Sequence, residues 1–313
     1  MKICIICAAN NNNFIKDIGI ALKKKNYNIN GYDNEFSAHI SGSDIIWLEW
    51  FDGSTVQVLM SPKSSTKKYI VRLHRYELFT KRTIAQLDEI TKLGYYKKID
   101  KLVFVSEYIR QIGIEKYPWM KDISVVIPNL IDMDKFPFIE REEGNKLLFL
   151  GKLAYVKNIP LLLACMSELH KKYPGYELHI VGSIWEEEIG QYLCNFIKKT
   201  GLKNVYFRGY VDNKDLPGFT AKMSWIACTS IIESQGLGIM ECMAMGMMPV
   251  IYNFGGAEDI FPEKFLFIHP CEFSEIIRYG YVRYSSHEYR YFVLNNYSIQ
   301  KKLHLYEDLL KEV

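Results

Sequence analysis

The feature that most constrains this chain is an alternation of short apolar runs with amphipathic segments. Lys2–Cys7 is an apolar run typical of a β-strand, and Phe14–Lys25 places its apolar residues on one helical face. A strand followed by a helix, repeated along a chain, is typical of a parallel sheet with helices on its faces. The sequence is therefore predicted to fold as an α/β protein.

The alternation occurs in two series. The first has a long helical pattern over Glu77–Leu93 and five further expected strands, at Tyr27–Tyr32, Asp44–Trp50, Tyr69–His74, Leu102–Ser106 and Ser124–Ile127. Prolines and a charged run then break the pattern between Pro128 and Glu143, where we predict a linker. The second series has a helix over Ile159–Tyr173 and expected strands at Lys146–Leu150, Glu177–Val181, Val205–Arg208, Trp225–Thr229, Pro249–Tyr252 and Phe265–Ile268.

Two series of this kind predict two Rossmann-like, doubly wound domains. We place them at residues 1–137 and 138–297, and we expect a terminal helix over 298–313 to join the first domain. The length of 313 residues fits two domains of about 150 residues each. Ligands of open α/β sheets bind beyond the carboxyl ends of the strands, so the site is expected in a cleft where the two domains face each other.

Composition excludes several classes of protein. Hydrophobic residues make up 49% and charged residues 24% of the chain, which is typical of an ordinary globular protein rather than a disordered one. No uncharged apolar stretch approaches the ~20 residues that span a bilayer, and the N-terminus lacks a secretory pattern, so a cytoplasmic protein is expected. The seven cysteines are expected to be reduced core residues, and their spacing gives no support for a zinc site.

The net charge of +3 is unevenly distributed. Residues 1–137 hold 20 Lys and Arg against 15 Asp and Glu, whereas the rest of the chain holds 19 against 21. The closely spaced Lys92, Lys97, Lys98 and Lys101 suggest loose attachment to an anionic membrane surface. A merely solvated basic surface is the alternative, and we expect no nucleic-acid partner.

The strongest chemical signal is the stretch Ser230–Gly246, SIIESQGLGIMECMAMG, which follows an apolar strand. Gly236 and Gly238 stand where a helix would begin, and the amides of a first helical turn bind anions such as phosphate. Glu233 precedes the helix, and Glu241 lies more than a turn inside it, where a carboxylate can accept hydrogen bonds from a diol. The alternative is an ordinary amphipathic helix with Glu241 on its solvated face.

Two further elements favour a phosphate site. Gly151 and Lys152 directly follow the strand KLLFL, and Lys157 comes before the next helix, so both lysines are expected over the same crevice. His74 ends a strand of the first domain and is expected to point into the cleft. The alternatives are solvated surface lysines and a structural histidine.

Together these elements resemble the retaining glycosyltransferases of family 4, the glycosyl transferases group 1, which have the GT-B fold. The resemblance rests on G-K-x4-K-N, on the Glu-x7-Glu element within SxxExxGxxxxECMAMGMMPV, on the following GG-A-E, and on PNLID-x3-F, and it is clearest over Ser124–Asp259. The chain departs from the family pattern in PNLID, in Cys228-Thr229-Ser230, in a short first domain, and in a turn at residues 8–13 that is rich in asparagine instead of glycine.

The resemblance implies a role for each matching residue. Lys152 and Lys157, after Gly151, would bind the donor diphosphate, Glu241 the ribose, and Glu233 the transferred sugar. The loop of Gly236, Leu237 and Gly238 would hold the sugar and its phosphate, Tyr210 and Val211 would contact the base, His74 would lie near the sugar, and Asn10 would replace a glycine of the first turn. His74, Glu233 and Lys157 are the expected catalytic residues.

The implied activity is a retaining, metal-independent transfer of a hexose from a UDP- or GDP-sugar to a hydroxyl of a glycan or lipid-linked acceptor, as in cell-surface polysaccharide synthesis. No cofactor is expected, because the nucleotide sugar is a substrate. Asp132-Met133-Asp134 resembles a metal-binding D-x-D but falls in the linker. The alternatives are a hydrolase using Glu233 and Glu241, a sugar-nucleotide epimerase of the same fold, and a non-catalytic nucleotide-sugar-binding module.

Overall fold

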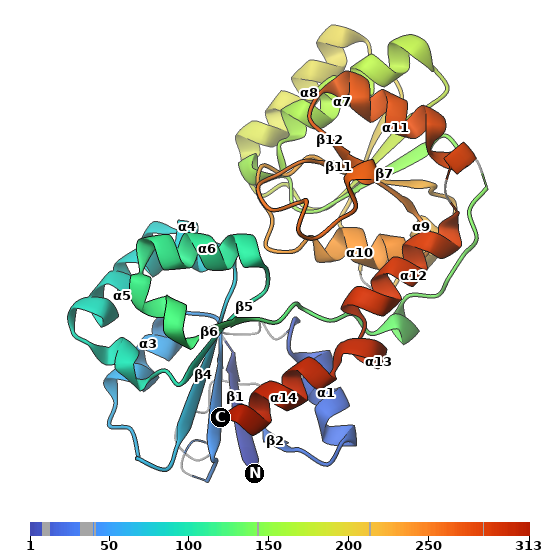
Figure 1. Ribbon diagram of the computed structural model, residues 1–313. Coiled ribbons are helices and arrows are strands. Elements are labelled where there is room, and N and C mark those ends of the chain that lie inside the picture. The colour runs from blue at the N-terminus through green and yellow to red at the C-terminus, as the bar shows by residue number, and fades with distance from the viewer. Residues whose placement is uncertain (8–12, 32–39, 41, 143, 213, 284) are drawn as a thin grey trace. The chain divides into compact units, whose positions relative to one another are not determined.

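The computed structural model describes residues 1–7, 13–31, 40, 42–142, 144–212, 214–283 and 285–313. The chain divides into two compact units, one of Met1–Leu130 with Tyr297–Val313 and one of Ile131–Asn296. This division lies a few residues before the boundary at 137 that the sequence suggested. Each unit holds one six-stranded parallel sheet, as the alternation of strands and helices predicted (Figure 1).

The first sheet has the strand order β2-β1-β3-β4-β5-β6. Its strands are β1 (Lys2–Cys7), β2 (Asn28–Asn30), β3 (Ile45–Glu49), β4 (Lys68–Leu73), β5 (Lys101–Phe104) and β6 (Ser124–Val126). Its helices are α1 (Lys16–Lys24), α3 (Gly53–Met60), α4 (Arg75–Phe79), α5 (Lys81–Lys92) and α6 (Glu107–Lys116). The helix expected over 77–93 is thus interrupted at Thr80, whose extended backbone separates α4 from α5.

The C-terminal segment completes this unit. Its helices are α13 (Ile299–Lys302) and α14 (His304–Glu312), within the range expected for one terminal helix. Tyr306, Leu309 and Leu310 of α14 share a buried apolar cluster with Ile3, Ile5 and other residues of the sheet. In Figure 1, α14 and α1 lie on one face of the first sheet. The end of the chain therefore supplies part of the core of the first unit.

The second sheet has the order β12-β11-β10-β7-β8-β9. Its strands are β7 (Lys146–Leu150), β8 (Glu177–Val181), β9 (Val205–Gly209), β10 (Trp225–Cys228), β11 (Met248–Tyr252) and β12 (Leu266–Phe267). Its helices are α7 (Ile159–Lys172), α8 (Glu187–Thr200), α9 (Leu216–Thr220), α10 (Leu237–Ala244), α11 (Pro270–Arg283) and α12 (Ser286–Tyr297), of which α12 reaches Tyr297 of the first unit. Because β7 pairs with β8 on one side and β10 on the other, the strand order reverses at β7.

The cysteines differ from the expectation in part. Cys4, Cys7, Cys165, Cys228 and Cys242 are buried, but Cys194 and Cys271 are exposed. The prediction that all seven are core residues was wrong for these two because Cys194 lies on the outer face of α8 and Cys271 in the first turn of α11. All seven are free thiols, and burial raises the pKa of Cys7 and Cys165 to about 12.

Candidate functional site

The candidate site is built at the carboxyl ends of β7 and β10, which pair with each other. In open α/β sheets the position where the strand order reverses is where ligands bind. Gly151 follows β7 with φ +156°, and a Cβ added there would lie 3.3 Å from Cε of Lys157. Glycine therefore leaves room for the Lys157 side chain over the end of the strand.

An ion pair joins the loops that follow these two strands. Nζ of Lys157 lies 2.5 Å from Oε1 of Glu233, and the hydroxyl of Ser230 donates to the same oxygen at 2.7 Å. The Thr229 hydroxyl donates to the Lys157 carbonyl at 3.0 Å, and the Ile231 amide donates to the Val156 carbonyl at 2.8 Å. The structure thus brings the predicted cation and the predicted sugar-facing carboxylate into direct contact.

Helix α10 begins beside this ion pair, at the residue where the sequence predicted a helix start. Gly236 precedes it with φ +78°, and a Cβ there would lie 2.9 Å from Cδ1 of Ile239. Lys157, Ser230 and Glu233 line a small pocket of about 50 Å³ together with Gly236, Leu237 and Gly238. A helix N-terminus and a lysine in one pocket form a site suited to an anion.

Other predicted residues of the second unit are not among those that line this pocket. Glu241 lies in α10, half-buried, and Tyr210 and Val211 follow the carboxyl end of β9, with Tyr210 exposed. The exposed Lys152 places Nζ 3.9 Å from the ring centre of Trp185, in a cation–π contact. Asn10 lies outside the described residues.

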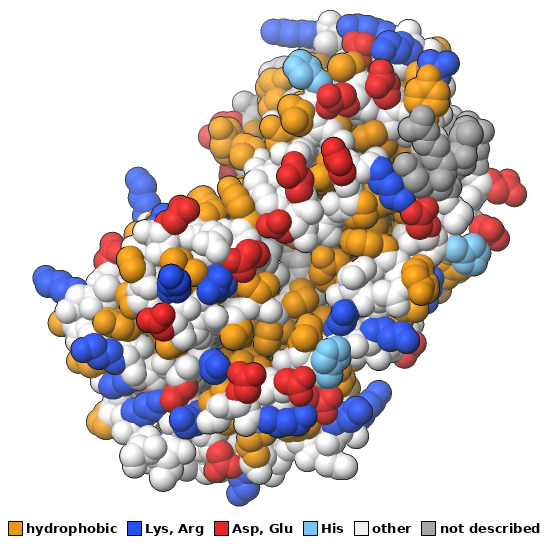
Figure 2. Space-filling view, in the orientation of Figure 1, with side chains coloured by type: hydrophobic (Ala, Val, Ile, Leu, Met, Phe, Trp, Pro, Cys, Tyr) orange, Lys and Arg blue, Asp and Glu red, His pale blue; other side chains and the backbone are white. Residues whose placement is uncertain are grey.

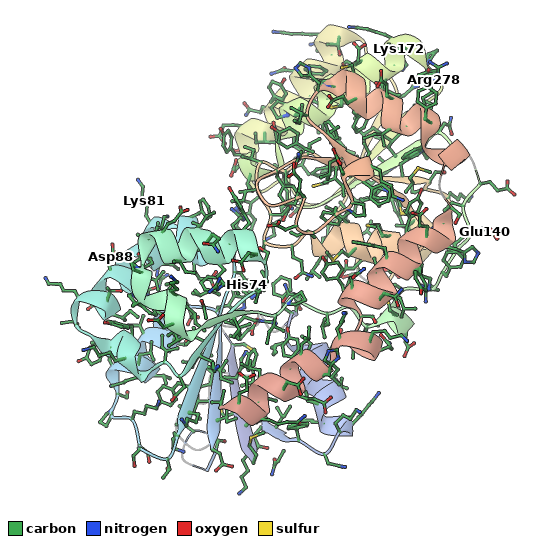
Figure 3. All side chains as sticks on the ribbon, in the orientation of Figure 1. His74, Lys81, Asp88, Glu140, Lys172 and Arg278 are labelled. Carbon is green, nitrogen blue, oxygen red and sulfur yellow. The ribbon has the colours of Figure 1, made fainter. Side chains whose placement is uncertain are left out.

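His74 lies at the carboxyl end of the first sheet, directly after β4, and is labelled in Figure 3. The residue is only 2% exposed, and its ring stacks on Trp50 with centroids 4.1 Å apart. Nε2 lies 3.2 Å from Oε1 of Glu49, and His74 and Glu77 form a capping box at the start of α4. His74 thus follows Leu73, the last residue of the strand, instead of ending it, and its side chain is packed inside the first unit instead of being exposed at a cleft.

A buried network surrounds this histidine. Arg72 donates to Oε1 of Glu49 from Nε at 3.0 Å and to the Tyr306 hydroxyl at 2.7 Å, which in turn donates to the Pro128 carbonyl at 2.9 Å. Burial opposes ionisation of Glu49, but the charge of Arg72 and the hydrogen bonds outweigh it and lower the pKa of Glu49 to about 2. Burial also lowers the pKa of His74, so its imidazole is neutral at pH 7.

Sequence reasoning gave no role to Ser230, Trp185 or Gly182. A Cβ on Gly182, which follows β8, would lie 1.9 Å from the carbonyl oxygen of Gly151, so only glycine allows the two loops to approach. The sequence did offer a signal for Gly182, which is a glycine placed directly after the predicted strand Glu177–Val181. Trp185 was not identifiable, because its contact with Lys152 depends on which strands are neighbours. Ser230 contacts Glu233 three residues later, so its signal was the local S-x-x-E spacing.

Some lysines of the predicted basic surface form hydrogen bonds or ion pairs with other residues of the protein. Lys98 donates to the carbonyls of Leu59 and Ser61, and Lys101 pairs with Glu312 at 3.1 Å. Figure 2 shows Lys and Arg side chains interspersed with Asp and Glu over the face in view. Among the residues described, no helix is long and apolar enough to cross a membrane, and no group of three or more His, Cys, Asp or Glu side chains could hold a metal ion.

Comparison with known proteins supports the assignment of the second unit. The family described as glycosyl transferases group 1 matches residues 131–279. Mannosylfructose-phosphate synthase of Agrobacterium fabrum is 29% identical over 182 residues, which cover 53% of this chain and 40% of that protein. The chain spans about half the length, or less, of the curated relatives that it matches.

Solved structures resemble the whole chain. Alr3699/HepE of Anabaena, in complex with UDP, has a TM-score of 0.79 at 15% identity, and the match covers both chains completely. Sucrose-phosphate synthase of Thermosynechococcus elongatus has a TM-score of 0.76 at 14% identity, covering 100% of this chain and 99% of that one. Residues 131–279 thus match the glycosyl transferases group 1 family, and the chain has the two-domain α/β fold of the GT-B glycosyltransferases.

Proposed function

We propose that this protein transfers a hexose from a nucleoside diphosphate sugar to a hydroxyl of a glycan or lipid-linked acceptor, with retention of anomeric configuration, as a member of family 4. The observation that carries the proposal is the contact of Lys157 with Glu233 beside the N-terminus of α10. The cation and the helix amides of this pocket match the diphosphate of such a donor, and the carboxylate matches its sugar hydroxyls.

The proposed mechanism follows from charge. As the bond between the sugar and the diphosphate breaks, negative charge grows on the leaving diphosphate, and Lys157, Lys152 and the first-turn amides of α10 would stabilise it. The acceptor hydroxyl would attack from the same face, and the leaving phosphate would take its proton. Because protein groups supply the positive charge, we propose that no metal ion is required.

The relatives suggest which donor to test first. HepE structures contain UDP, UDP with glucose, and UDP-glucose, so uridine nucleotides are the first probes for this chain. A thermal-shift panel of UDP, GDP and their sugars identifies the nucleotide, because a ligand at 100 times its Kd adds about 2.7 kcal/mol of stability. Absence of a shift with every nucleoside diphosphate and sugar in the panel would contradict the proposal.

Product analysis separates the proposed transferase from its rivals. A transferase forms a new glycoside only when an acceptor is present, an epimerase converts the sugar nucleotide without an acceptor, and a hydrolase releases free sugar from a glycoside. A non-catalytic module binds the nucleotide sugar and turns nothing over. Retention is read from the anomeric configuration of the product.

We also propose that the first unit makes peripheral contact with anionic membranes, which would bring the enzyme to a lipid-linked acceptor. The hypothesis rests on the +5 charge of residues 1–137 and on Lys92 and Lys97, near the end of α5 and after it. Flotation with anionic vesicles at low salt should recover the protein, and high salt should release it. No binding at low salt would end the hypothesis.

A further inference from the structure

Lys157 and Ser230 contact the same oxygen of the Glu233 carboxylate, and they are donors of different kinds. Lys157 brings a charge on a long side chain that is 25% exposed. Ser230 brings a neutral hydroxyl at 2.7 Å, and its side chain is 1% exposed. One partner can therefore turn to a ligand, whereas the other is fixed inside the protein.

Ser230 is held in place by its neighbours on both sides. Thr229 donates through its hydroxyl to the Lys157 carbonyl, and the Ile231 amide donates to the Val156 carbonyl. These bonds tie the loop after β10 to the loop after β7 through the backbone of residues 156 and 157. The Ser230 hydroxyl therefore keeps its position when the Lys157 side chain moves.

The proposed reaction requires Lys157 to move. A diphosphate carries more negative charge than one carboxylate, so a bound donor competes with Glu233 for the Lys157 ammonium. Once Lys157 turns to the diphosphate, it no longer holds the Glu233 carboxylate, at the moment when that carboxylate must face the sugar. The hydrogen bond from Ser230 does not depend on Lys157, so it can keep the carboxylate oriented.

We propose that Ser230 is a positioning residue, which holds the Glu233 carboxylate toward the transferred sugar while Lys157 binds the diphosphate. This inference rests on the proposed function. The nearly complete burial of Ser230 leaves little surface for direct contact with a ligand, so it acts through Glu233. Replacing Ser230 should therefore affect binding of the transferred sugar and not binding of the nucleotide.

The test compares binding of a diphosphate with binding of its sugar. Calorimetry measures Kd for UDP and UDP-glucose, or for the GDP pair if the wild type prefers it, with Ser230→Ala and the size-conserving Ser230→Cys. The matched control is Ser274→Ala, because Ser274 is similarly buried and its hydroxyl donates within α11, to the Pro270 carbonyl. We expect Ser230→Ala to weaken sugar-nucleotide binding or slow turnover about tenfold, the effect of one hydrogen bond to a charged group.

Measuring UDP and UDP-glucose separately distinguishes a failure of the Ser230 inference from a failure of the proposed function. UDP affinity should stay within about twofold of wild type, since the cation and the helix amides remain. An equal loss for UDP and UDP-glucose would assign Ser230 a structural role and overturn the inference. So would a Ser230→Ala variant that matches Ser274→Ala in sugar-dependent binding and in turnover, whereas Ser230→Cys, whose thiol is a weaker donor, should fall between the two. A wild-type protein that binds neither UDP nor GDP would instead overturn the proposed function itself.

Discussion

The ammonium of Lys157 lies 2.5 Å from a carboxylate oxygen of Glu233, although 76 positions separate the two residues in the chain. The contact exists because β7 and β10 are neighbours in the second sheet, so the loops that follow them meet at one edge. The Lys157 ammonium and the Glu233 carboxylate neutralise each other's charge. A bound donor would exchange this internal ion pair for two separate contacts, one with phosphate and one with sugar.

The first prediction concerns Lys157. Replacing it with alanine should remove roughly 2.7 to 4 kcal/mol of transition-state stabilisation, which slows transfer by about 100-fold or more. The matched control is Lys171→Ala, because Lys171 is 73% exposed on its side chain and pairs only with a nearby glutamate in α7. Steady-state turnover of the two variants checks this, and a Lys157→Ala enzyme with wild-type turnover would remove Lys157 from the mechanism.

The second prediction separates the two glutamates by ligand. Glu241→Ala should weaken binding of the plain nucleoside diphosphate by about 1.5 to 3 kcal/mol, because it removes charged hydrogen bonds to the ribose. Glu233→Gln should leave that affinity unchanged or raise it, because Lys157 no longer binds a carboxylate, while turnover falls. Calorimetry with UDP makes the comparison. Equal loss of UDP affinity in both variants would contradict the division of roles.

The sequence predicted the elements well because each carries its own periodicity. The expected strands at Lys2–Cys7, Lys146–Leu150 and Glu177–Val181 match β1, β7 and β8 residue for residue. The glycines at the start of α10 were predictable for the same reason, since a helix start is a local signal. What the sequence could not supply were contacts between distant segments.

The network around His74 could not be predicted from the sequence. The position of His74 after a strand was read from its neighbours in the sequence, but its burial depends on Trp50 and Glu49, which come from the loop after β3 and from its last residue. Arg72 is a charged residue in an otherwise apolar strand, and it is fully buried, where it donates to Glu49 and to Tyr306 from the end of the chain. Contacts of this kind depend on the tertiary fold, so local sequence patterns cannot reveal them.

The third prediction concerns the close approach of Gly182 to Gly151. Gly182→Ala would place a Cβ 1.9 Å from a carbonyl oxygen, so backbone must shift at the edge of the site. We expect a loss of more than about 2 kcal/mol in the free energy of unfolding, together with weaker nucleotide binding. Gly218→Ala in α9 is the control, since a Cβ there meets nothing within 4 Å and should be neutral or slightly stabilising. Denaturant titration of both variants tests this, and equal stabilities would contradict it.

The fourth prediction concerns acid stability. The folded-state pKa of Glu49 is about 2, below its ordinary value of 4.5, so its contribution is fully present above pH 4.5 and is lost as the pH falls toward 2. At 1.36 kcal/mol for each unit of pKa, this loss amounts to about 3 kcal/mol. Glu49→Gln should be less stable at pH 7, because it leaves Arg72 buried without its carboxylate, but should lose less stability between pH 4.5 and 2.

Tyr306→Phe serves as the control for this pH dependence. It removes one hydrogen bond from Arg72 but keeps the Glu49 carboxylate, so its loss of stability on acidification should parallel that of the wild type. Free energies of unfolding from urea titrations at several pH values give the comparison. Parallel curves for wild type and Glu49→Gln would show that Glu49 does not contribute to acid unfolding.

The last prediction tests whether protein groups alone neutralise the leaving diphosphate. Asp132 and Asp134 form the D-x-D, but Asp132 instead caps a short helical turn at Met133–Lys135, where its Oδ1 accepts from the Asp134 amide at 3.3 Å. Asparagine keeps an oxygen that can accept this bond, so Asp132→Asn and Asp134→Asn should change turnover little. Activity should also survive EDTA, because Lys157, Lys152 and the first-turn amides of α10 would supply the positive charge that a metal ion would otherwise provide. The measurement is transfer rate after exhaustive dialysis against EDTA, with and without added magnesium or manganese. Complete loss that either metal restores would overturn the metal-free mechanism and the roles assigned to both lysines.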